Sequence, residues 1–383
     1  MSKRSIIFRI HHFFEILYDF DPNKGPLDLF ISRYFRAHSQ LGSKDRLFIV
    51  ERLYTFFRWK GLIDVLLEKE PKYEEALFEL LDQDFTPYSS DTSLDEHIRF
   101  SFPKDLFDSL KRRWKQETPA LCLASNKSAP ITLRANSMKT TRRELIECLC
   151  SHDIEAKEDP QSPQAITLPR RINVWVLPEF TQGLFEMQDA GSQKVAELVE
   201  VEPGESFLDY CAGSGGKALA CAPRMKNRGQ MFLHDIRVKA LQEAKKRLRR
   251  AGIQNAQCIN HEEKKRLTLL KGRMDWVLVD APCSGTGTLR RNPDMKWQFS
   301  YEKLCRLVKE QREIFEQALE FVRPGGKIMY ATCSLLAEEN EEQRDHFLRN
   351  YPLEIVGEPF QSVPRDGQMD GFYAVCMQKR VDT

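Results

Sequence analysis

Two cysteines that each follow a short apolar segment are the residues of this sequence best suited to carry chemistry. Cys283 stands in the segment 279–287, which reads VDAPCSGTG, and Cys333 stands in the segment 329–334, which reads MYATCS. Because each follows a candidate β-strand, we expect both thiols at the carboxyl edge of an α/β sheet, where such folds bind ligands. A thiolate can act as a covalent catalyst and can add reversibly to an electron-poor pyrimidine ring. A free cysteine is commonly a packing residue, but two in such settings favour catalysis.

The composition is that of a globular protein with little overall charge. The chain has 383 residues, of which 41% are hydrophobic and 30% charged, and its formal net charge is +2. This length allows two or three domains with well-filled cores. Because the net charge is small, any affinity for RNA must come from local basic patches.

The remaining sequence signals predict a cytoplasmic protein with free thiols. The apolar segment near the start is too short for a secretory signal, and no later segment approaches the length of a membrane span. The ten cysteines include no CxxC pair, so we expect neither a disulfide framework nor a metal site. A reducing cytoplasm would keep these thiols free.

The pattern of apolar residues divides the chain into three regions. Residues 1–118 show helical spacing over 6–17, 27–35 and 47–57, with Ser43 as a candidate helix cap. Residues 119–184 predict a small α/β module with a helix capped by Thr140 or Thr141 and strands at 131–136, 165–168 and 174–177. In residues 185–383, strands alternate with helices, which predicts a parallel sheet with helices on both faces. Its expected strands are 206–210, 230–234, 274–279, 327–331 and 372–377.

A glycine-rich loop follows the first of these strands. It runs from Cys211 to Lys217, and glycines at the start of a helix let a ligand approach the backbone closely. Asp235, about 20 residues later, is placed to accept hydrogen bonds from ribose hydroxyls. Position 218 is Ala rather than the last glycine of the dinucleotide fingerprint. The loop therefore favours S-adenosyl-L-methionine, which has no pyrophosphate, over a nicotinamide dinucleotide.

Three longer motifs resemble one family of enzymes. The segments 280–287 (DAPCSGTG), 290–297 (RRNPDMKW) and 330–343 (YATCSLLAEENEEQ) are similar to the Sun/Fmu-type (RsmB/NOP) RNA (cytosine-5)-methyltransferases, as are 185–193 (FEMQDAGSQ) and the turn at 370–372. The helices around 27–63 resemble the NusB-like RNA-binding extension of the bacterial 16S ribosomal RNA branch. The resemblance implies an α/β class I (Rossmann-like) methyltransferase domain at 185–383. A helical NusB-like domain at 1–118 and a small α/β RNA-presenting module at 119–184 would precede it.

The resemblance also implies roles for individual residues. Cys333 would attack carbon 6 of a cytosine, which makes carbon 5 nucleophilic toward the methyl group. Cys283 would assist loss of the carbon-5 proton and release of the product, and Asp280 would hydrogen-bond the base. Apart from the resemblance, two interpretations of Lys217 stay open: a positive charge that lowers the pKa of a thiol, or a solvated lysine in the first turn of the helix. The implied cofactor-binding residues are Cys211, Ala212, Gly213, Ser214, Gly215, Gly216, Lys217, Asp235, Arg237 and Asp280. The implied RNA-phosphate contacts are Arg290, Arg291 and Lys296.

The chain departs from the family pattern at two places. In the glycine loop, Gly213, Ser214 and Ala218 stand where the family usually has Ala, Pro and Thr. Losing the proline removes a backbone constraint, which predicts weaker cofactor affinity without a displaced site. After the strand near Cys258, the family usually places an acidic residue beside the adenine. This chain has Asn260, His261 and Glu262 there, so the adenine contact stays unassigned.

Several functions remain open from the sequence. The leading hypothesis is an RNA cytosine methyltransferase acting on single-stranded or looped RNA. The resemblance of the helical extension implies small-subunit ribosomal RNA as the substrate. Alternatives are a transfer RNA cytosine-5 methyltransferase and a weakly active RNA-binding assembly factor with the same fold. A nicotinamide-dependent oxidoreductase would need the complete glycine fingerprint. RNA is the expected partner, with no membrane and no obligate protein partner evident.

Overall fold

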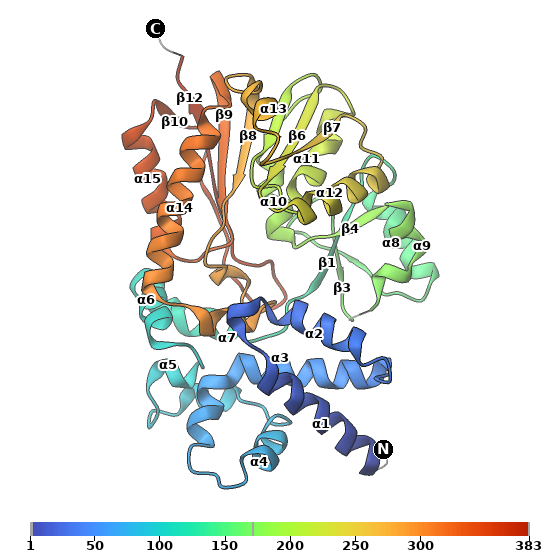
Figure 1. Ribbon diagram of the computed structural model, residues 1–383, viewed down its shortest axis with the longest axis vertical. Coiled ribbons are helices and arrows are strands. Elements are labelled where there is room, and N and C mark those ends of the chain that lie inside the picture. The colour runs from blue at the N-terminus through green and yellow to red at the C-terminus, as the bar shows by residue number, and fades with distance from the viewer. Residues whose placement is uncertain (1–2, 171, 382–383) are drawn as a thin grey trace. The chain divides into compact units, whose positions relative to one another are not determined.

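The computed structural model describes residues 3–170 and 172–381 (Figure 1). These residues form two compact units. The first unit comprises the chain up to Ser128 together with Thr288–Lys303, and the second comprises Ala129–Gly287 and the chain from Leu304 onward. The segment Thr288–Lys303, which the predicted boundaries place in the catalytic domain, thus packs with the amino-terminal helices.

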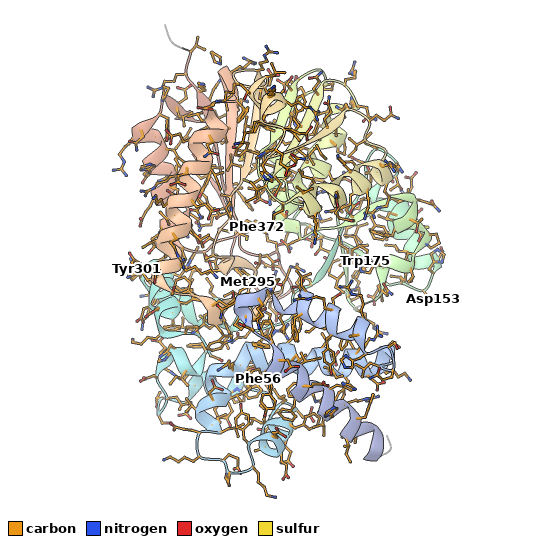
Figure 2. All side chains as sticks on the ribbon, viewed as in Figure 1. Phe56, Asp153, Trp175, Met295, Tyr301 and Phe372 are labelled. Atoms are coloured by element: carbon orange, nitrogen blue, oxygen red, sulfur yellow. The ribbon has the colours of Figure 1, made fainter. Side chains whose placement is uncertain are left out.

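The first unit is built from helices around an aromatic and aliphatic core. Phe13, Leu53 and Leu62 are fully buried in it, and Phe56 lies among the helices in Figure 2. These apolar residues recur at helical spacing, so each helix buries one face. The elements are α1 Lys3–Asp19, α2 Leu27–Ala37, α3 Ser43–Leu66, α4 Tyr73–Leu80, α5 Glu96–Arg99, α6 Lys104–Trp114 and α7 Thr118–Ser125, with the 3-10 turns η1 Pro22–Lys24, η2 Thr86–Ser90, η3 Lys115–Glu117 and η6 Pro293–Gln298.

The predicted cap of α3 is off by one residue. Gly42, not Ser43, is the cap, and its N–H donates to Asp45 Oδ2 at 3.1 Å. The carboxylate of Asp45 therefore satisfies a backbone donor at the start of the helix, as in a capping box.

A small antiparallel sheet opens the second unit, with strand order β2-β3-β1-β4. Its helix α8 begins with a capping box. Glu144 N–H donates to Thr141 Oγ1 at 3.2 Å, and Thr141 N–H donates to Glu144 Oε2 at 2.8 Å. Thr141 is thus the cap. The elements are β1 Ile131–Ala135, β2 Lys157–Glu158, β3 Ala165–Leu168, β4 Phe185–Met187, α8 Arg142–Ser151 and α9 Pro178–Gln182.

The prediction of a strand at residues 174–177 is wrong. The residues Val174–Val176 form the 3-10 turn η4 instead. Asn173 caps this turn by accepting a hydrogen bond from Trp175 N–H at 3.3 Å, and Pro178 begins α9 directly afterwards. A short run of β-branched and aromatic residues favours a strand only if a neighbouring strand pairs with it.

The large sheet of the second unit has the order β10-β12-β9-β8-β5-β6-β7, with β11 paired to β12. The strands are β5 Ser206–Asp209, β6 Gln230–Asp235, β7 Ala256–Asn260, β8 Met274–Asp280, β9 Val322–Thr332, β10 Leu353–Ile355, β11 Phe360–Gln361 and β12 Tyr373–Lys379. The helices are α10 Ala190–Glu197, α11 Gly216–Met225, α12 Val238–Ala251, α13 Lys264–Thr268, α14 Tyr301–Leu319 and α15 Glu341–Asn350, and η5 Thr286–Thr288 and η7 Ala337–Glu339 are 3-10 turns.

This sheet is mixed rather than wholly parallel, which corrects the prediction. The strands from β7 to β9 pair in parallel, whereas β12 pairs antiparallel with β9, and β10 and β11 pair antiparallel with β12. The strand β9 also begins at Val322, earlier than the strand predicted at 327–331, so Pro324 and the two glycines after it lie inside the strand.

Alternate residues of the strands enter two hydrophobic cores. Phe207 belongs to one core and its neighbour Leu208 to the other, because successive side chains of a strand point to opposite faces. Helices α10 to α12 cover the first face and α14 and α15 the second (Figure 1). Among the described helices, none has both the length and the apolar character needed to cross a bilayer.

Candidate active site

The two predicted nucleophiles lie side by side. Cys283 and Cys333 follow β8 and β9, which are parallel neighbours with Asp280 opposite Ala331. Both loops therefore leave the same edge of the sheet, and the two Sγ atoms are 3.4 Å apart. The contact with Cys333, together with burial, raises the pKa of Cys283 well above its ordinary value. Cys283 is thus a protonated thiol at neutral pH, able to donate a hydrogen bond to the Cys333 sulfur.

A fully buried carboxyl group joins the two cysteine loops. Glu339 accepts hydrogen bonds from Ser284 N–H at 2.8 Å, from the hydroxyls of Ser284 and Ser334, and from Gln311 Nε2 at 3.0 Å. The same Gln311 amide donates to Pro282 O at 2.9 Å. Burial raises the pKa of Glu339 despite these bonds. The network connects the loop after β8 to the loop after β9 and so fixes the separation of the thiols.

The glycine loop connects β5 to α11. Gly213 and Gly215 adopt φ angles of +53° and +79°, which residues with a side chain rarely adopt. A Cβ on Gly215 would also lie 3.1 Å from Leu233 and 3.3 Å from Ala244. The loop therefore needs glycine at this position in order to pack on its neighbours.

A cavity of about 870 Å³ opens beside this loop at the carboxyl ends of the strands. Nine of the ten predicted cofactor-binding residues line it, and Gly215 is the exception. Asp235 ends β6 and accepts hydrogen bonds from Gly213 N–H at 2.7 Å and from Arg237. Burial opposes ionisation of Asp235, but the bonds from Arg237 and Gly213 outweigh it and hold its pKa below the usual value. An ionised acceptor at this position fits a ribose.

Lys217 and Asp280 form an ion pair inside the cavity. Lys217 Nζ lies 2.6 Å from Asp280 Oδ2 and 5.4 Å from the ring centroid of Phe372, which is labelled in Figure 2. Burial works against the charge of Lys217, but the attraction of Asp280, its hydrogen bond and the weaker attractions of Cys333 and Asp209 together outweigh burial and raise the pKa of Lys217. Lys217 is therefore a buried cation whose charge Asp280 partly balances.

Asp209 is a cavity residue that the sequence analysis missed. It is the last residue of β5 and 1% exposed, and its Oδ1 has no hydrogen-bond partner among the described residues. Burial and the nearby Asp280 raise its pKa to about 8, so the carboxyl group is largely protonated at neutral pH. Its position at the end of a strand, directly before the glycine loop, was a signal that could have found it.

Two further residues border the cavity without a clear sequence signal. Arg247 lies on α12 and lines the cavity. The many basic residues of this helix are typical of a solvated surface, so its sequence does not indicate that Arg247 is part of a site. His261 is the one of the three candidate adenine neighbours that lines the cavity. Asn260 instead accepts a hydrogen bond from Glu262 N–H at 2.9 Å, which closes a local turn.

Two of the three predicted RNA contacts require correction. Arg290 is 2% exposed and Lys296 is 1% exposed, both within the first unit. Lys296 Nζ donates to Arg58 O at 2.6 Å and to Asn126 Oδ1 at 2.8 Å, and burial lowers its pKa well below the ordinary value. An amino group buried in this way anchors the fold and cannot reach a phosphate. Arg291 is half-buried and stays a predicted contact.

The described side chains that could bind a metal ion are not those that line the cavity. Among the described residues, two clusters have three potential ligand atoms within 4.8 Å of one another. Neither cluster includes a residue that lines the cavity. They are His11, His12 and Glu15, and Cys148, His152 and Glu179.

Comparison with known proteins places this architecture in one family. The model of the family described as 16S rRNA methyltransferase RsmB/F matches residues 196–377, and that of its ferredoxin-like domain matches 102–175. Ribosomal RNA small subunit methyltransferase B of Klebsiella pneumoniae is 32% identical over 331 residues, covering 84% of this chain and 73% of that protein. The chain belongs to the RsmB/F family. It is therefore an RNA methyltransferase that uses S-adenosylmethionine.

Solved structures confirm the class I methyltransferase fold of this RsmB/F member. A methyltransferase homologue from Pyrococcus horikoshii has a TM-score of 0.67 and 27% identity, covering 76% of this chain and 99% of that one. The structure described as PH0851 has a TM-score of 0.78 at 22% identity, covering 92% and 95% of the two chains, and shows the fold alone.

Proposed function

We propose that this protein methylates carbon 5 of a cytosine in RNA through a covalent cysteine adduct at carbon 6. The observation that carries the proposal is the thiol pair, 3.4 Å apart at the sheet edge. Asp280 and Pro282, from the loop that leads to Cys283, line the cavity beside it. The pair therefore lies next to the site for the methyl donor.

The thiols divide the chemistry between them. The thiolate of Cys333 adds to carbon 6, and the electron pair displaced from the 5,6 double bond makes carbon 5 nucleophilic. S-adenosylmethionine, when bound, supplies an electrophilic methyl group to carbon 5. Cys283 takes the carbon-5 proton as the bond from Cys333 to carbon 6 breaks, and its own thiol proton passes to the departing Cys333 sulfur, 3.4 Å away.

Asp280 and Lys217 would assist at the base. The carboxylate of Asp280 is partly exposed to the cavity, with its side chain 34% accessible. It would accept a hydrogen bond from the cytosine amino group, and from N3 once that nitrogen carries a proton in the adduct. Lys217 holds Asp280 at 2.6 Å, so it orients this carboxylate as well as adding positive charge near the thiols. A buried ion pair of this kind resists reorientation because an unpaired charge would be costly.

Small-subunit ribosomal RNA is the substrate class that we propose. The relative from Klebsiella pneumoniae is named for small-subunit ribosomal RNA, and the helical first unit would contribute RNA binding, as its NusB-like resemblance implies. The target base must leave its stack to reach the thiols, which favours single-stranded or looped RNA.

A denaturing gel tests the proposal directly. Protein is mixed with transcribed 16S ribosomal RNA and S-adenosylmethionine, and wild type is compared with Cys283→Ala and Cys333→Ala. We expect a covalent RNA–protein band in Cys283→Ala, because the adduct forms but does not resolve, and no band in Cys333→Ala. Cys305→Ala, which removes an exposed cysteine of the same unit, serves as the matched control and should behave as wild type.

Other outcomes would change the assignment. A band that depends on Cys283 would reverse the two thiol roles. A covalent band with transfer RNA, and none with ribosomal RNA, would identify transfer RNA as the substrate class. No band in any variant, with RNA binding intact, would favour a non-catalytic assembly factor.

A further inference from the structure

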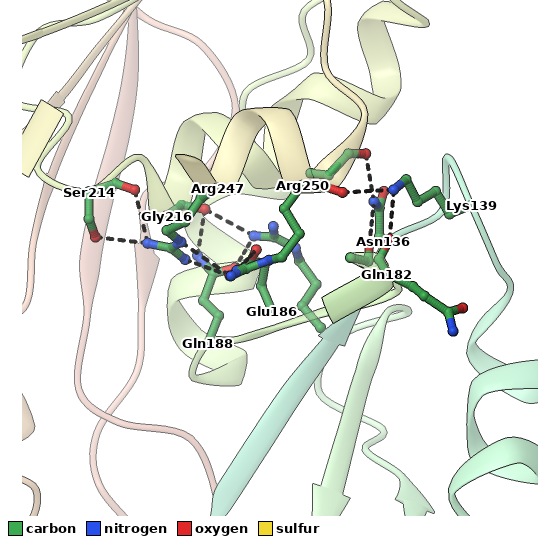
Figure 3. Close-up of polar contacts among 12 residues, drawn as sticks. Asn136, Lys139, Gln182, Glu186, Gln188, Ser214, Gly216, Arg247 and Arg250 are labelled. Carbon is green, nitrogen blue, oxygen red and sulfur yellow. Dashed lines mark hydrogen bonds and ion pairs between the residues drawn. The ribbon is translucent and has the colours of Figure 1, made fainter. Parts of the chain in front are cut away.

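Two arginines donate hydrogen bonds to the glycine loop, and Figure 3 labels one of them, Arg247. Arg247, on α12, donates from Nη1 to Ser214 O at 2.9 Å and to Ser214 Oγ at 2.8 Å. Arg134, on β1 of the small sheet, donates from Nη1 to Gly216 O at 2.9 Å. The guanidinium groups thus hold two successive parts of the loop by charge-assisted hydrogen bonds, which are stronger than neutral ones.

The small sheet anchors these arginines. Glu186, on β4, pairs with Arg247 at 3.1 Å and with Arg250 at 2.5 Å. Gln188 donates to Gly216 O at 3.2 Å and accepts a hydrogen bond from Arg134. The side chain of Glu186 is 5% exposed and that of Arg247 14% exposed. Because the pair is largely removed from water, solvent screens it little.

The conformational freedom of the loop explains why such support would matter. Ser214 lies between Gly213 and Gly215, both at positive φ. Glycines lose much backbone entropy when they are ordered. No proline restricts this stretch, so the fixed guanidinium of Arg247 is the constraint that the structure provides at Ser214.

We propose that Arg247, held by Glu186, is a positioning residue for S-adenosylmethionine, and that it acts by presetting the glycine loop at Ser214. The small sheet is then part of the cofactor site, although Glu186 does not line the cavity. The inference concerns cofactor binding alone and does not rest on the cytosine chemistry proposed above.

Calorimetric titration of the full chain with S-adenosylmethionine, without RNA, tests this role. We expect Arg247→Met to raise the Kd about tenfold, which corresponds to about 1.4 kcal/mol. The Kd of Arg247→Lys should lie between those of wild type and Arg247→Met, because lysine keeps the positive charge but lacks the planar, multiply donating guanidinium group. Arg249→Met is the matched control: Arg249 lies on the same helix, is exposed, and its loss should leave the Kd within about twofold of wild type. In turnover assays, the KM for the cofactor should rise while kcat is retained.

A double-mutant cycle separates loop positioning from direct cofactor contact. Ser214→Ala removes the hydroxyl acceptor and should raise the Kd two- to threefold in the wild-type background, an estimate of roughly 0.5 kcal/mol. In the Arg247→Met background, Ser214→Ala should leave the Kd for S-adenosylmethionine unchanged. Additive effects would show that Arg247 contacts the cofactor itself, and an unchanged Kd in Arg247→Met would also overturn the proposal. If Arg247→Met proves unfolded by its thermal transition, the same cycle is run with Arg247→Lys.

Discussion

The Sγ atoms of Cys283 and Cys333 lie 3.4 Å apart on loops that leave two parallel neighbouring strands. A disulfide needs about 2.05 Å between the sulfur atoms, so a small shift of either side chain brings them into bonding range. Proximity of this kind has a redox consequence as well as a catalytic one.

Mild oxidation is therefore expected to join the two thiols and stop adduct formation. Treatment with diamide should produce a Cys283–Cys333 disulfide, detected by peptide mapping without reductant, and dithiothreitol should restore activity. Because Cys305 is exposed and lies outside the pair, Cys305→Ala should not protect the enzyme. Inactivation by diamide without this cross-link would mean that the two loops do not approach in solution.

Replacing Glu339 should reduce turnover without changing cofactor affinity. Glu339→Gln keeps one acceptor oxygen and replaces the other by an amide donor, which would face donors of Ser284 and Ser334 or of Ser284 and Gln311. The network between the cysteine loops therefore loses half of its carboxylate acceptor. We expect kcat to fall roughly tenfold or more, because small displacements of reacting groups are costly, and stability to fall by about 1–3 kcal/mol. Glu342→Gln, an exposed neighbour on α15, is the control. An equal rise in the Kd for S-adenosylmethionine would contradict a role confined to the thiols.

Asp209 should make stability depend on pH near neutrality. Its pKa rises from 3.8 to about 8 on folding, so between these values the folded protein holds a proton that the unfolded chain has lost. Stability therefore falls as pH rises through this range. The thermal midpoint of wild type should decline more steeply between about pH 5 and about pH 8 than that of Asp209→Asn, which cannot ionise. Parallel curves for the two proteins would show that Asp209 is ionised in the fold.

Lys296 should contribute to the stability of the first unit and not to RNA binding. Lys296→Met leaves Arg58 O and Asn126 Oδ1 without their donor, at an expected cost of about 1–3 kcal/mol in urea unfolding. The slope of log affinity for RNA against log salt should not change, because no phosphate contact is lost. A shallower slope in Lys296→Met would show that Lys296 contacts RNA after all. Arg291→Met, which changes the residue that stays a predicted RNA contact, is measured for comparison.

Local sequence patterns predicted the strands that carry the site. The apolar runs before Asp280 and Cys333 became β8 and β9, and the run before Cys211 became β5, because buried parallel strands consist of short continuous apolar segments. The direction of the last strand could not be predicted in this way. Residues 372–377 have the pattern of a strand, but their antiparallel pairing with β9 depends on the path of the chain between them.

The burial of charged residues was the main feature that the sequence concealed. Lys296 and Arg290 stand in a basic, polar segment that is typical of a surface, but the partners of Lys296 lie 170 and 238 residues away in the sequence. The support of Ser214 by Arg247 is likewise invisible to local patterns, because the helix that carries Arg247 has the composition of a solvated face.

The membership of Thr288–Lys303 in the first unit also has a consequence for biosynthesis. Trp297 Nε1 donates to Phe57 O at 2.6 Å, and Leu27 N–H donates to Asp294 Oδ2 at 3.3 Å. During translation, the amino-terminal helices emerge long before these partners do, so the unit that is made first cannot be completed until the ribosome has passed Lys303. Strands β5 to β8 are by then already outside or in the exit tunnel. A nascent chain stalled before residue 288 would lack Trp297 and would therefore expose the surface that this side chain covers.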